Sequence, residues 1–330
     1  MITRENELIE RIAKAFGRHQ HGLRGIRLGI GDDAALFRPR AGHETILTCD
    51  WFLEGTHFLR DKHPPDSVGW KCLARALSDV AAMGGIPRCL LLSLAIPASH
   101  TGPWLDEFLA GLHRASRRFQ CALAGGDTTC RDNILINVTV VGEVRNGHAI
   151  LRSGARDGDV ICVSGRLGEA ALGLRILQGS KHTISSRDPR LRKHLYPEPR
   201  LALGRWLAEK RLATSMIDIS DGLSTDLRHL CPGPRLGALL GPDWFPAVEV
   251  PARLQARMGD PLELALHGGD DYELLFTVRR WKLPSLPRKF RGLTISPIGY
   301  VTSGPNLVWM DPKDPYILHP SGWDPFRTAK

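Results

Sequence analysis

The chain has 330 residues, of which 42% are hydrophobic and 24% are charged. This length suits two domains of ordinary size, and the composition is typical of a globular enzyme and excludes a disordered chain. The formal net charge of +9 favours anionic ligands, either nucleic acid or small phosphorylated molecules. The sequence has no RNP-like aromatic motif, no zinc-finger spacing and no long block of Lys and Arg. We therefore expect small anions as ligands and no nucleic-acid partner.

Cysteine usage and hydropathy indicate the compartment. None of the seven cysteines forms a C-x-x-C pair, and most lie in apolar runs, as buried thiols in a reducing compartment do. Segment 1–16 is charged and amphipathic and lacks the apolar core of a signal peptide. The longest apolar stretch, at 89–97, is too short to span a bilayer. The sequence therefore predicts a cytoplasmic protein without a membrane partner.

The first half of the chain alternates predicted strands with predicted helices. Leu8, Ile9, Ile12 and Phe16 lie on one helical face, so the chain opens with a helix. In chain order we then predict a strand over 44–49, a helix over 68–83, a strand over 88–96, a helix from Pro103, a strand over 121–124 and a strand over 133–144.

After Gly147 the pattern restarts, which divides the chain into an N-terminal domain, 1–150, and a C-terminal domain, 151–330. In the second part we predict a strand over 159–163, a helix from Glu169, a helix over 197–211, a strand over 216–219, a helix over 221–230 and a strand over 273–278. Segment 232–251 is rich in Pro and Gly and has no clear period. Because strands and helices alternate in both parts, the fold class is α/β, or α+β with layered sheets.

Aspartates recur beside glycines or at the ends of apolar runs. Taken singly, most of them fit a turn or a helix N-cap. Asp50 and Asp218, however, end or interrupt strand-like apolar runs, where a lone charge is costly to bury without a partner. Asp79 falls in the second half of a predicted helix, where the helix dipole disfavours a negative charge. Such a misplaced acid indicates a compensating cation.

Several carboxylates without a matching set of His or Cys point to a hard metal ion. Mg²⁺ takes oxygen ligands and commonly shares them with substrate phosphates. The sequence has no Gly-Lys pair and hence no Walker A loop, no protein-kinase catalytic loop, no G-x-S-x-G elbow and no H-E-x-x-H zinc motif. The residues therefore predict a magnesium-dependent enzyme that acts on phosphates.

Nine motifs, read in order, resemble the thiamine-monophosphate kinase family, which belongs to the superfamily of aminoimidazole ribonucleotide synthetase. The resemblance extends from about residue 28 to residue 326. The motifs are GIGDD at 29–33, TCD at 48–50, EGTHF at 54–58, LSDVAAMG at 77–84, GGDTT at 125–129, RSGA at 152–155, DISDGL at 218–223, GGDDYE at 268–273 and GWDPF at 322–326.

The resemblance implies that the γ-phosphoryl group of ATP is transferred to thiamine monophosphate, the last step of thiamine diphosphate biosynthesis. It implies several Mg²⁺ ions as cofactors, held by Asp33, Thr48, Cys49, Asp50, Asp79, Asp127, Asp218 and Asp221. It assigns ATP contacts to Gly126, Asp127, Arg152 and Ser220, and thiamine monophosphate contacts to His57, Asp270 and Trp323. It also implies an N-terminal α/β domain that binds metal and ATP, with its sheet pairing across a homodimer, and a C-terminal α/β domain.

Three positions depart from the family pattern. Cys49 stands where a metal-binding hydroxyl residue is usual, which leaves its backbone carbonyl as the credible ligand for a hard metal. Asp270 stands where Glu is common and is one methylene shorter. Trp323 replaces a frequent Tyr and keeps an aromatic surface for a thiamine ring.

No catalytic side chain is expected to form a covalent bond or act as a general base. The acceptor is a phosphate oxygen that is already ionised near neutral pH, so positioning and charge neutralisation suffice for direct in-line transfer. Metal ions would clamp both phosphates. Arg152 would offset the remaining charge through its planar guanidinium, and His57 would orient the substrate.

Two alternatives stay open at this point. The first is a sister enzyme of the superfamily: aminoimidazole ribonucleotide synthetase, selenophosphate synthetase or the hydrogenase-maturation dehydratase. The dehydratase would require a C-terminal cysteine, but this sequence ends in Lys330. Selenophosphate synthetase would require a reactive cysteine near the N-terminus, but the first cysteine here is Cys49. The second is a regulatory module that binds divalent ions or nucleotides without turnover, for which Cys49 and Asp270 are the hints.

Overall fold

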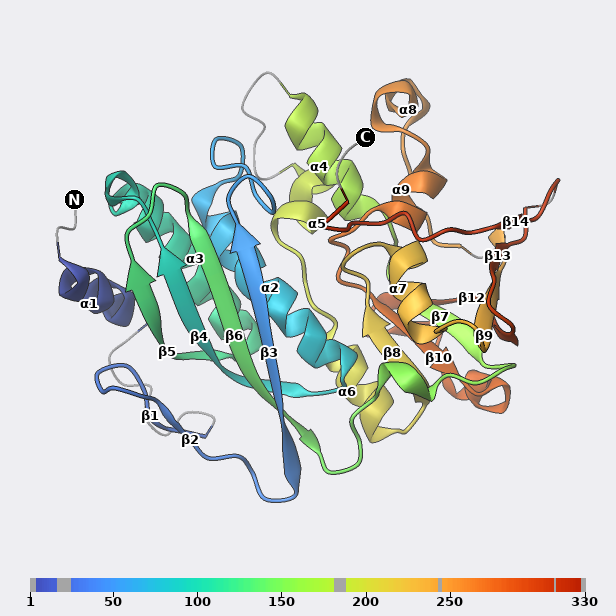
Figure 1. Ribbon diagram of the computed structural model, residues 1–330, viewed down its shortest axis with the longest axis horizontal. Coiled ribbons are helices and arrows are strands. Elements are labelled where there is room, and N and C mark those ends of the chain that lie inside the picture. The colour runs from blue at the N-terminus through green and yellow to red at the C-terminus, as the bar shows by residue number, and fades with distance from the viewer. Residues whose placement is uncertain (1–3, 17–24, 181–187, 243–244, 312, 328–330) are drawn as a thin grey trace. The chain divides into compact units, whose positions relative to one another are not determined.

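The computed structural model describes residues 4–16, 25–180, 188–242, 245–311 and 313–327. The chain divides into two compact units. The first comprises 1–80, 85–147 and 195–197, and the second 81–84, 148–194 and 198–330. Each unit combines β-sheet with helices (Figure 1), as the predicted α/β class requires. None of the described helices combines the length and the apolar character that a membrane span needs.

The first unit is built on a four-stranded sheet in the order β3-β6-β4-β5. Its strands are β3 (His43–Leu53), β4 (Ile86–Ala95), β5 (Ala122–Thr129) and β6 (Leu135–Arg145). β6 pairs antiparallel with β3 and β4, whereas β4 and β5 run parallel. A parallel pair needs a crossover connection, and α3 (Pro103–Phe119) supplies it.

The helices α2 (Pro65–Ala82) and α3 cover one face of this sheet (Figure 1). They approach closely because Gly69 and Gly111 lie at their contact: a Cβ at either position would collide with the backbone carbonyl of Phe108 or Asp66. The predicted opening helix is α1 (Glu5–Phe16), which buries Leu8 and contacts α3 and β5. A small hairpin of β1 (Ile26–Leu28) and β2 (Leu36–Phe37) completes the unit.

The second unit has an eight-stranded sheet whose central strand β7 is buried on both faces. Along β7, Val160 and Cys162 point to one hydrophobic core, and Ile161 and Val163 to another. The strands are β7 (Val160–Ser164), β8 (Ala213–Asp218), β9 (Leu236–Leu240), β10 (Leu274–Val278), β11 (Lys289–Phe290), β12 (Leu293–Ser303), β13 (Leu307–Trp309) and β14 (Tyr316–Ile317). Their order is β14-β13-β9-β12-β7-β10-β8, with β11 beside β12.

Helices contribute to both cores of this unit. The core that contains Val160 includes Leu203 and Leu207 of α6, whereas the core that contains Ile161 includes Leu223 and Leu227 of α7. The helices are α4 (Glu169–Gly179), α5 (Arg192–Leu195), α6 (Leu201–Glu209), α7 (Leu223–Leu230), α8 (Ala252–Met258) and α9 (Pro261–His267). Leu195, the last residue of α5, belongs to the first unit.

Several sequence predictions need correction. The strand expected over 44–49 continues to Leu53, so Asp50 lies within β3 and not at its end. The helix expected over 197–211 begins only at Leu201, because proline disfavours helical geometry in the residue before it and Pro197 and Pro199 both precede the helix. The helix expected from Asp221 begins after Gly222, whose φ of 112° is not helical. Segment 232–251 contains the strand β9, and β5 continues beyond Ala124 to Thr129.

Candidate active site

In the first unit, β3 and α2 bring two candidate acids and a hydroxyl group together. Thr48 and Asp50 are two residues apart on β3, so they project from the same face of the sheet. The Thr48 hydroxyl donates a hydrogen bond to the carboxylate of Asp79 on α2. One helical turn earlier, Arg75 Nη2 lies 3.8 Å from Asp50 Oδ1. Arg75 thus lies on the same side of α2 as Asp79, next to Asp50.

The side chain of Cys49 lies on the opposite face of β3. Its Sγ is 3.2 Å from Asn137 Oδ1 on the neighbouring strand. This face of β3 also carries Leu47, which is 71% exposed, and Trp51, which is 56% exposed. The thiol of Cys49 is therefore directed away from Thr48 and Asp50.

Asp33 and Asp127 line one cavity of about 830 Å³ in the first unit. The cavity is bounded by α1, the loop around Asp33 and the strands β4 and β5. Gly126 lies at its wall, where a Cβ would collide with the backbone of Leu92. Glycine is therefore required here, and a ligand in the cavity can approach the backbone closely. Both acids are exposed.

His57 lies in the loop that follows β3 and is half-buried. Its Nδ1 accepts a hydrogen bond of 3.0 Å from the backbone N–H of Leu53. The ring centroid is 5.8 Å from that of Phe52. Since Nδ1 is an acceptor, the neutral ring carries its proton on Nε2. This arrangement holds the imidazole in one orientation.

In the second unit, the loop after β8 folds around the buried carboxylate of Asp226. The Oδ2 atom of Asp226 accepts hydrogen bonds of 3.1–3.2 Å from the backbone N–H groups of Ser220, Asp221 and Gly222. Burial, together with the charges of Asp218 and Asp221, raises the pKa of Asp226 to about 8. Asp218 itself is buried, 3% exposed, at the end of β8. Asp226 thus fixes the backbone around Asp221, one of the candidate metal-binding acids.

Asp270 and Trp323 join this loop through backbone hydrogen bonds. The N–H of Asp270 donates to the Ser220 carbonyl, and the N–H of Trp323 to the Asp221 carbonyl, both over 2.8 Å. Asp270 and Tyr272 have φ values of 68° and 49°, a strained conformation for residues other than glycine. The Tyr272 hydroxyl donates to Asp270 Oδ1 over 2.6 Å. The indole of Trp323 is 50% exposed and available for stacking.

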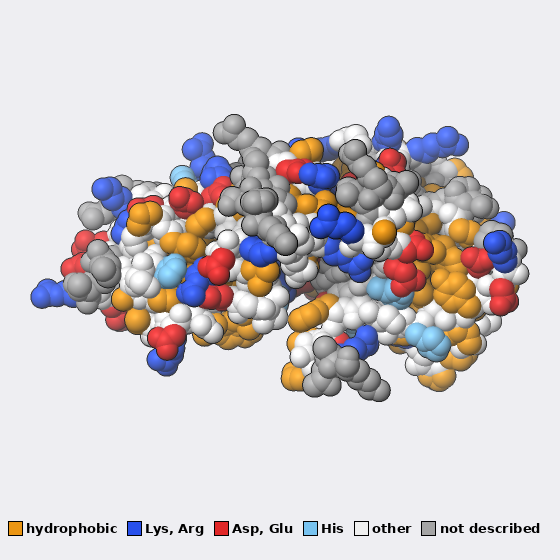
Figure 2. Space-filling view, turned by 90° about the horizontal axis from the view of Figure 1, so that it is seen from above, with side chains coloured by type: hydrophobic (Ala, Val, Ile, Leu, Met, Phe, Trp, Pro, Cys, Tyr) orange, Lys and Arg blue, Asp and Glu red, His pale blue; other side chains and the backbone are white. Residues whose placement is uncertain are grey.

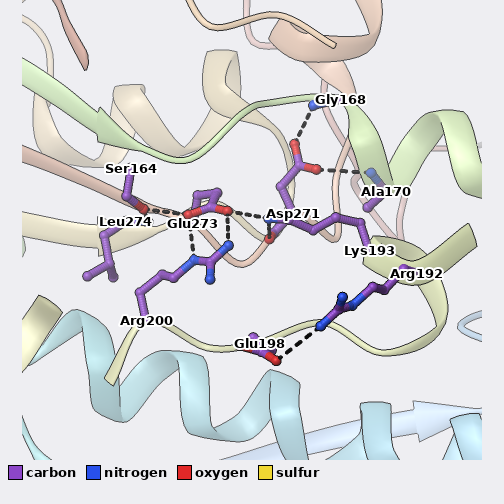
Figure 3. Close-up of polar contacts among 10 residues, drawn as sticks. All are labelled: Ser164, Gly168, Ala170, Arg192, Lys193, Glu198, Arg200, Asp271, Glu273 and Leu274. Carbon is purple, nitrogen blue, oxygen red and sulfur yellow. Dashed lines mark hydrogen bonds and ion pairs between the residues drawn. The ribbon is translucent and has the colours of Figure 1, made fainter. Parts of the chain in front are cut away.

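A buried ion cluster is centred on Glu273 (Figure 3). Glu273, fully buried, accepts hydrogen bonds from Lys193, Arg200 and the Ser164 hydroxyl. Burial opposes the charge of Glu273, but the two cations outweigh it and lower the pKa of this carboxyl. The cluster ties α5 and the residue before α6 to Glu273, the residue directly before β10.

Asp271, two residues before Glu273, is also buried. Its carboxylate accepts the backbone N–H groups of Gly168 and Ala170 at the start of α4, over 2.6 and 3.1 Å (Figure 3). Burial raises the pKa of Asp271 to about 7, against the effect of Lys193 and of these two N–H groups. Asp271 therefore serves as a helix cap, and the Asp32 carboxylate likewise accepts the neighbouring N–H of Asp33.

The candidate residues fall into three groups. Thr48, Asp50 and Asp79 form the first, and Asp33, Gly126 and Asp127 line the same cavity. The third group is the platform of Asp218, Ser220, Asp221, Asp270 and Trp323.

Arg152 is exposed on a short 3-10 helix, Arg152–Gly154. Within the part of the chain that the structure describes, no three His, Cys, Asp or Glu side chains form a group that could hold a metal ion.

Sequence reasoning missed Glu273, Lys193, Arg200 and Asp226. Glu273 carried the same signal as Asp50, a lone charge at the edge of an apolar strand. Its partners could not be identified, because Lys193 and Arg200 lie more than 70 residues earlier in a stretch rich in basic residues.

Comparison with known proteins identifies the family. Residues 31–144 match the family described as AIR synthase related protein, N-terminal domain. The chain is 35% identical to the thiamine-monophosphate kinase of Escherichia coli (strain K12), over 96% of this chain and 97% of the relative. It is 32% identical to that of Bacillus subtilis (strain 168), over 92% and 94%.

Solved structures agree with these relatives. The thiamine-monophosphate kinase from Stenotrophomonas maltophilia K279a has a TM-score of 0.78 and 35% identity, covering 92% of this chain and 96% of that one. AaThiL complexed with AMPPCP and TMP has a TM-score of 0.75 and 30% identity, covering 99% and 100%. A hydrogenase maturation protein HypE has a TM-score of 0.76 at 18% identity and shares the fold. The chain belongs to the thiamine-monophosphate kinase family.

Proposed function

We propose that this chain transfers the γ-phosphoryl group of ATP to thiamine monophosphate, which yields thiamine diphosphate and ADP. The observation that carries the proposal is the hydrogen-bonded platform in the second unit. It joins Ser220 and Asp221, to which the resemblance assigns nucleotide and metal contacts, to Asp270 and Trp323, to which it assigns substrate contacts. AaThiL, similar over the whole chain, was solved with AMPPCP and TMP, that is, with an ATP analogue and the phosphate acceptor.

Magnesium fits the donors that the candidate groups offer, because all are hard oxygen atoms. We propose Asp33, Thr48, Asp50, Asp79, Asp127, Asp218 and Asp221 as the protein's contribution, with Cys49 limited to its carbonyl. No three of the acids form a complete site alone, and Mg²⁺ commonly completes its shell with water and substrate phosphates. When bound, the ions would neutralise the charge of the reacting phosphates.

The chain's own residues bind and orient the substrates. We propose that the Trp323 ring stacks on the thiamine ring, since half of its surface is exposed beside Asp221. Asp270, oriented by the Tyr272 hydroxyl, would contact the cationic substrate. His57 would donate a hydrogen bond from Nε2 to the substrate. Arg152 and Gly126 would contact ATP, with Arg152 offsetting phosphate charge. The phosphate acceptor needs no general base.

The decisive assay measures ADP release by the purified chain with MgATP. We expect ADP release when thiamine monophosphate is added and none above background with free thiamine, because only the monophosphate carries the accepting oxygen. Omitting Mg²⁺ should abolish the reaction. Tight binding of ATP without ADP release would instead favour a regulatory module, and an absence of both would sink the kinase proposal.

We further propose a homodimer formed through the face of the first unit's sheet that α2 and α3 do not cover. Leu47 and Trp51 are apolar and more than half exposed on this face of β3, and exposed apolar patches mark association surfaces. A charge at the centre of such an interface would be buried without a partner. Leu47→Glu should therefore shift the protein to a monomer in sedimentation velocity, whereas Leu151→Glu, an exposed leucine elsewhere, should not. Dimers of unchanged mass in Leu47→Glu would exclude this face.

A cytoplasmic location is proposed on the basis of the cysteines. All seven are free, and five of them are buried. Burial raises the pKa of Cys89 and Cys231 to about 11 and that of Cys162 to about 12, so these thiols stay protonated and unreactive. Such thiols suit a reducing compartment.

A further inference from the structure

The segment 279–300 of the second unit is strongly basic. It contains six Arg and Lys residues and no Asp or Glu. It forms a 3-10 helix, Arg280–Ser285, then β11 and most of β12. Neither the candidate active site nor the hydrophobic cores use its exposed cations.

This segment encloses a groove of about 690 Å³. Apolar side chains such as Val160, Leu283, Ile295 and Tyr300 form much of its lining, and Arg288 and Lys289 complete it. Pockets of 300–1,000 Å³ with apolar walls and a few placed polar groups are typical small-molecule sites.

Most of the nearby cations are engaged, and two are not. Arg279 forms an ion pair with Asp159 over 2.7 Å, and the guanidinium of Arg280 lies 6.0 Å from the Tyr300 ring centroid. Arg288 and Lys289 are exposed, and neither has an acidic partner among the residues that the structure describes. Two unpaired positive charges beside an apolar groove attract an anion that carries an apolar body.

The groove is separate from the candidate active site. Arg288 and Lys289 lie beside the start of β12, where Lys289 pairs with Thr294 and Ile295 pairs with Ser164 of β7. Asp218 lies on β8, and the sheet order β12-β7-β10-β8 places three strand spacings between β12 and β8. Three spacings correspond to about 14 Å. The two cations therefore lie three strands away from Asp218.

We propose that this groove binds a small phosphate ester that carries a flat ring, the chemistry shared by nucleotides and thiamine phosphates. The apolar walls would hold the ring, and Arg288 and Lys289 the phosphate groups. Single-stranded nucleic acid fits less well, because Lys282 lies over Trp281 and Arg280 over Tyr300, so the protein's own cations cover one face of each ring.

On one face, charges of both signs are mixed. On the face shown in Figure 2, the coloured Lys and Arg side chains lie in separate groups interspersed with Asp and Glu. Nucleic-acid binding surfaces instead carry a continuous basic stripe.

Equilibrium dialysis of the full chain against labelled ATP and, separately, labelled thiamine diphosphate tests the proposal. We expect two bound molecules per chain for at least one of the two probes. The probe that gives two shows whether the groove binds a nucleotide or a thiamine phosphate. The double variant Arg288→Glu/Lys289→Glu should bind only one, with affinity at the lost site reduced at least about tenfold. Its turnover with MgATP and thiamine monophosphate should be unchanged, since neither residue belongs to the candidate site.

A matched control changes the same charge elsewhere on the second unit. Arg257→Glu/Lys313→Glu replaces two exposed cations and should keep both molecules. If the charge reversal unfolds the protein, Arg288→Gln/Lys289→Gln gives the same comparison. Equal stoichiometry in the wild type and the groove variant would overturn the proposal, as would a labelled single-stranded oligonucleotide that binds the groove more tightly than either probe. The count is independent of turnover, so it remains informative if the kinase assay fails.

Discussion

Replacing Asp79 with asparagine is expected to lower kcat by at least about a thousandfold. The Asp79 carboxylate contacts the Thr48 hydroxyl beside Asp50 and is a proposed magnesium ligand. Charge stabilisation by a metal ion contributes several kcal/mol to a phosphoryl transfer, and about 4 kcal/mol corresponds to a thousandfold in rate. Asparagine keeps the size and one oxygen atom but removes the charge that holds the ion. Initial rates of ADP release, measured across a range of Mg²⁺ concentrations, give this value.

The matched control for Asp79 is Asp106→Asn. Asp106 is exposed on α3 and forms an ion pair with Arg11. Surface pairs of this kind contribute at most about 1 kcal/mol to stability and nothing to the chemistry proposed here, so turnover should stay within twofold of the wild type. Circular dichroism should show the same fold in both variants. Wild-type turnover in Asp79→Asn would remove this acid from the metal site.

Replacing Glu273 with glutamine is expected to lower the free energy of unfolding by about 3–5 kcal/mol. Glu273 is fully buried and compensates the charges of Lys193 and Arg200. Glutamine would leave both cations in the interior without a counter-charge, and breaking a buried ion pair from one side has this magnitude. Urea unfolding followed by fluorescence measures the change.

Glu209→Gln provides the comparison for Glu273. Glu209 pairs with Arg205 one turn earlier on α6, and both side chains are exposed. Its loss should change the free energy of unfolding by less than about 0.5 kcal/mol. Equal stabilities of the two variants would show that the buried cluster does not hold the segment around Lys193 and Arg200.

The sequence predicted most of the fold because hydrophobic spacing is a local signal. The stripe around Cys72 and the β-branched run at 133–144 became α2 and β6. Boundaries failed where a backbone constraint competed with the spacing: the prolines before Leu201 delayed α6, and Gly222 delayed α7. β9 was missed because its five residues lie in a Pro- and Gly-rich stretch.

The sequence named the candidate residues but not their geometry. Motif order placed Asp218 and Asp270 in one functional set, and hydrogen bonds do join their loops. The supporting contacts were beyond the sequence, because Asp226, Tyr272 and Glu273 act through partners that only folding brings near. Long-range pairing of this kind leaves no periodic trace in the chain.

The contact between Gly69 and Gly111 has a consequence for how the sequence can vary. Gly69 lies in the first part of α2, the same rigid helix that carries Asp79 near its other end. A methyl group at either glycine would push α2 away from α3, and a helix transmits such a displacement along its length. The position of Asp79, which we assign to metal binding, therefore depends on the absence of a side chain at both Gly69 and Gly111. Gly69 lies nearly three helical turns from Asp79 on α2. Variation in this family should be restricted at these glycines as tightly as at the acids themselves.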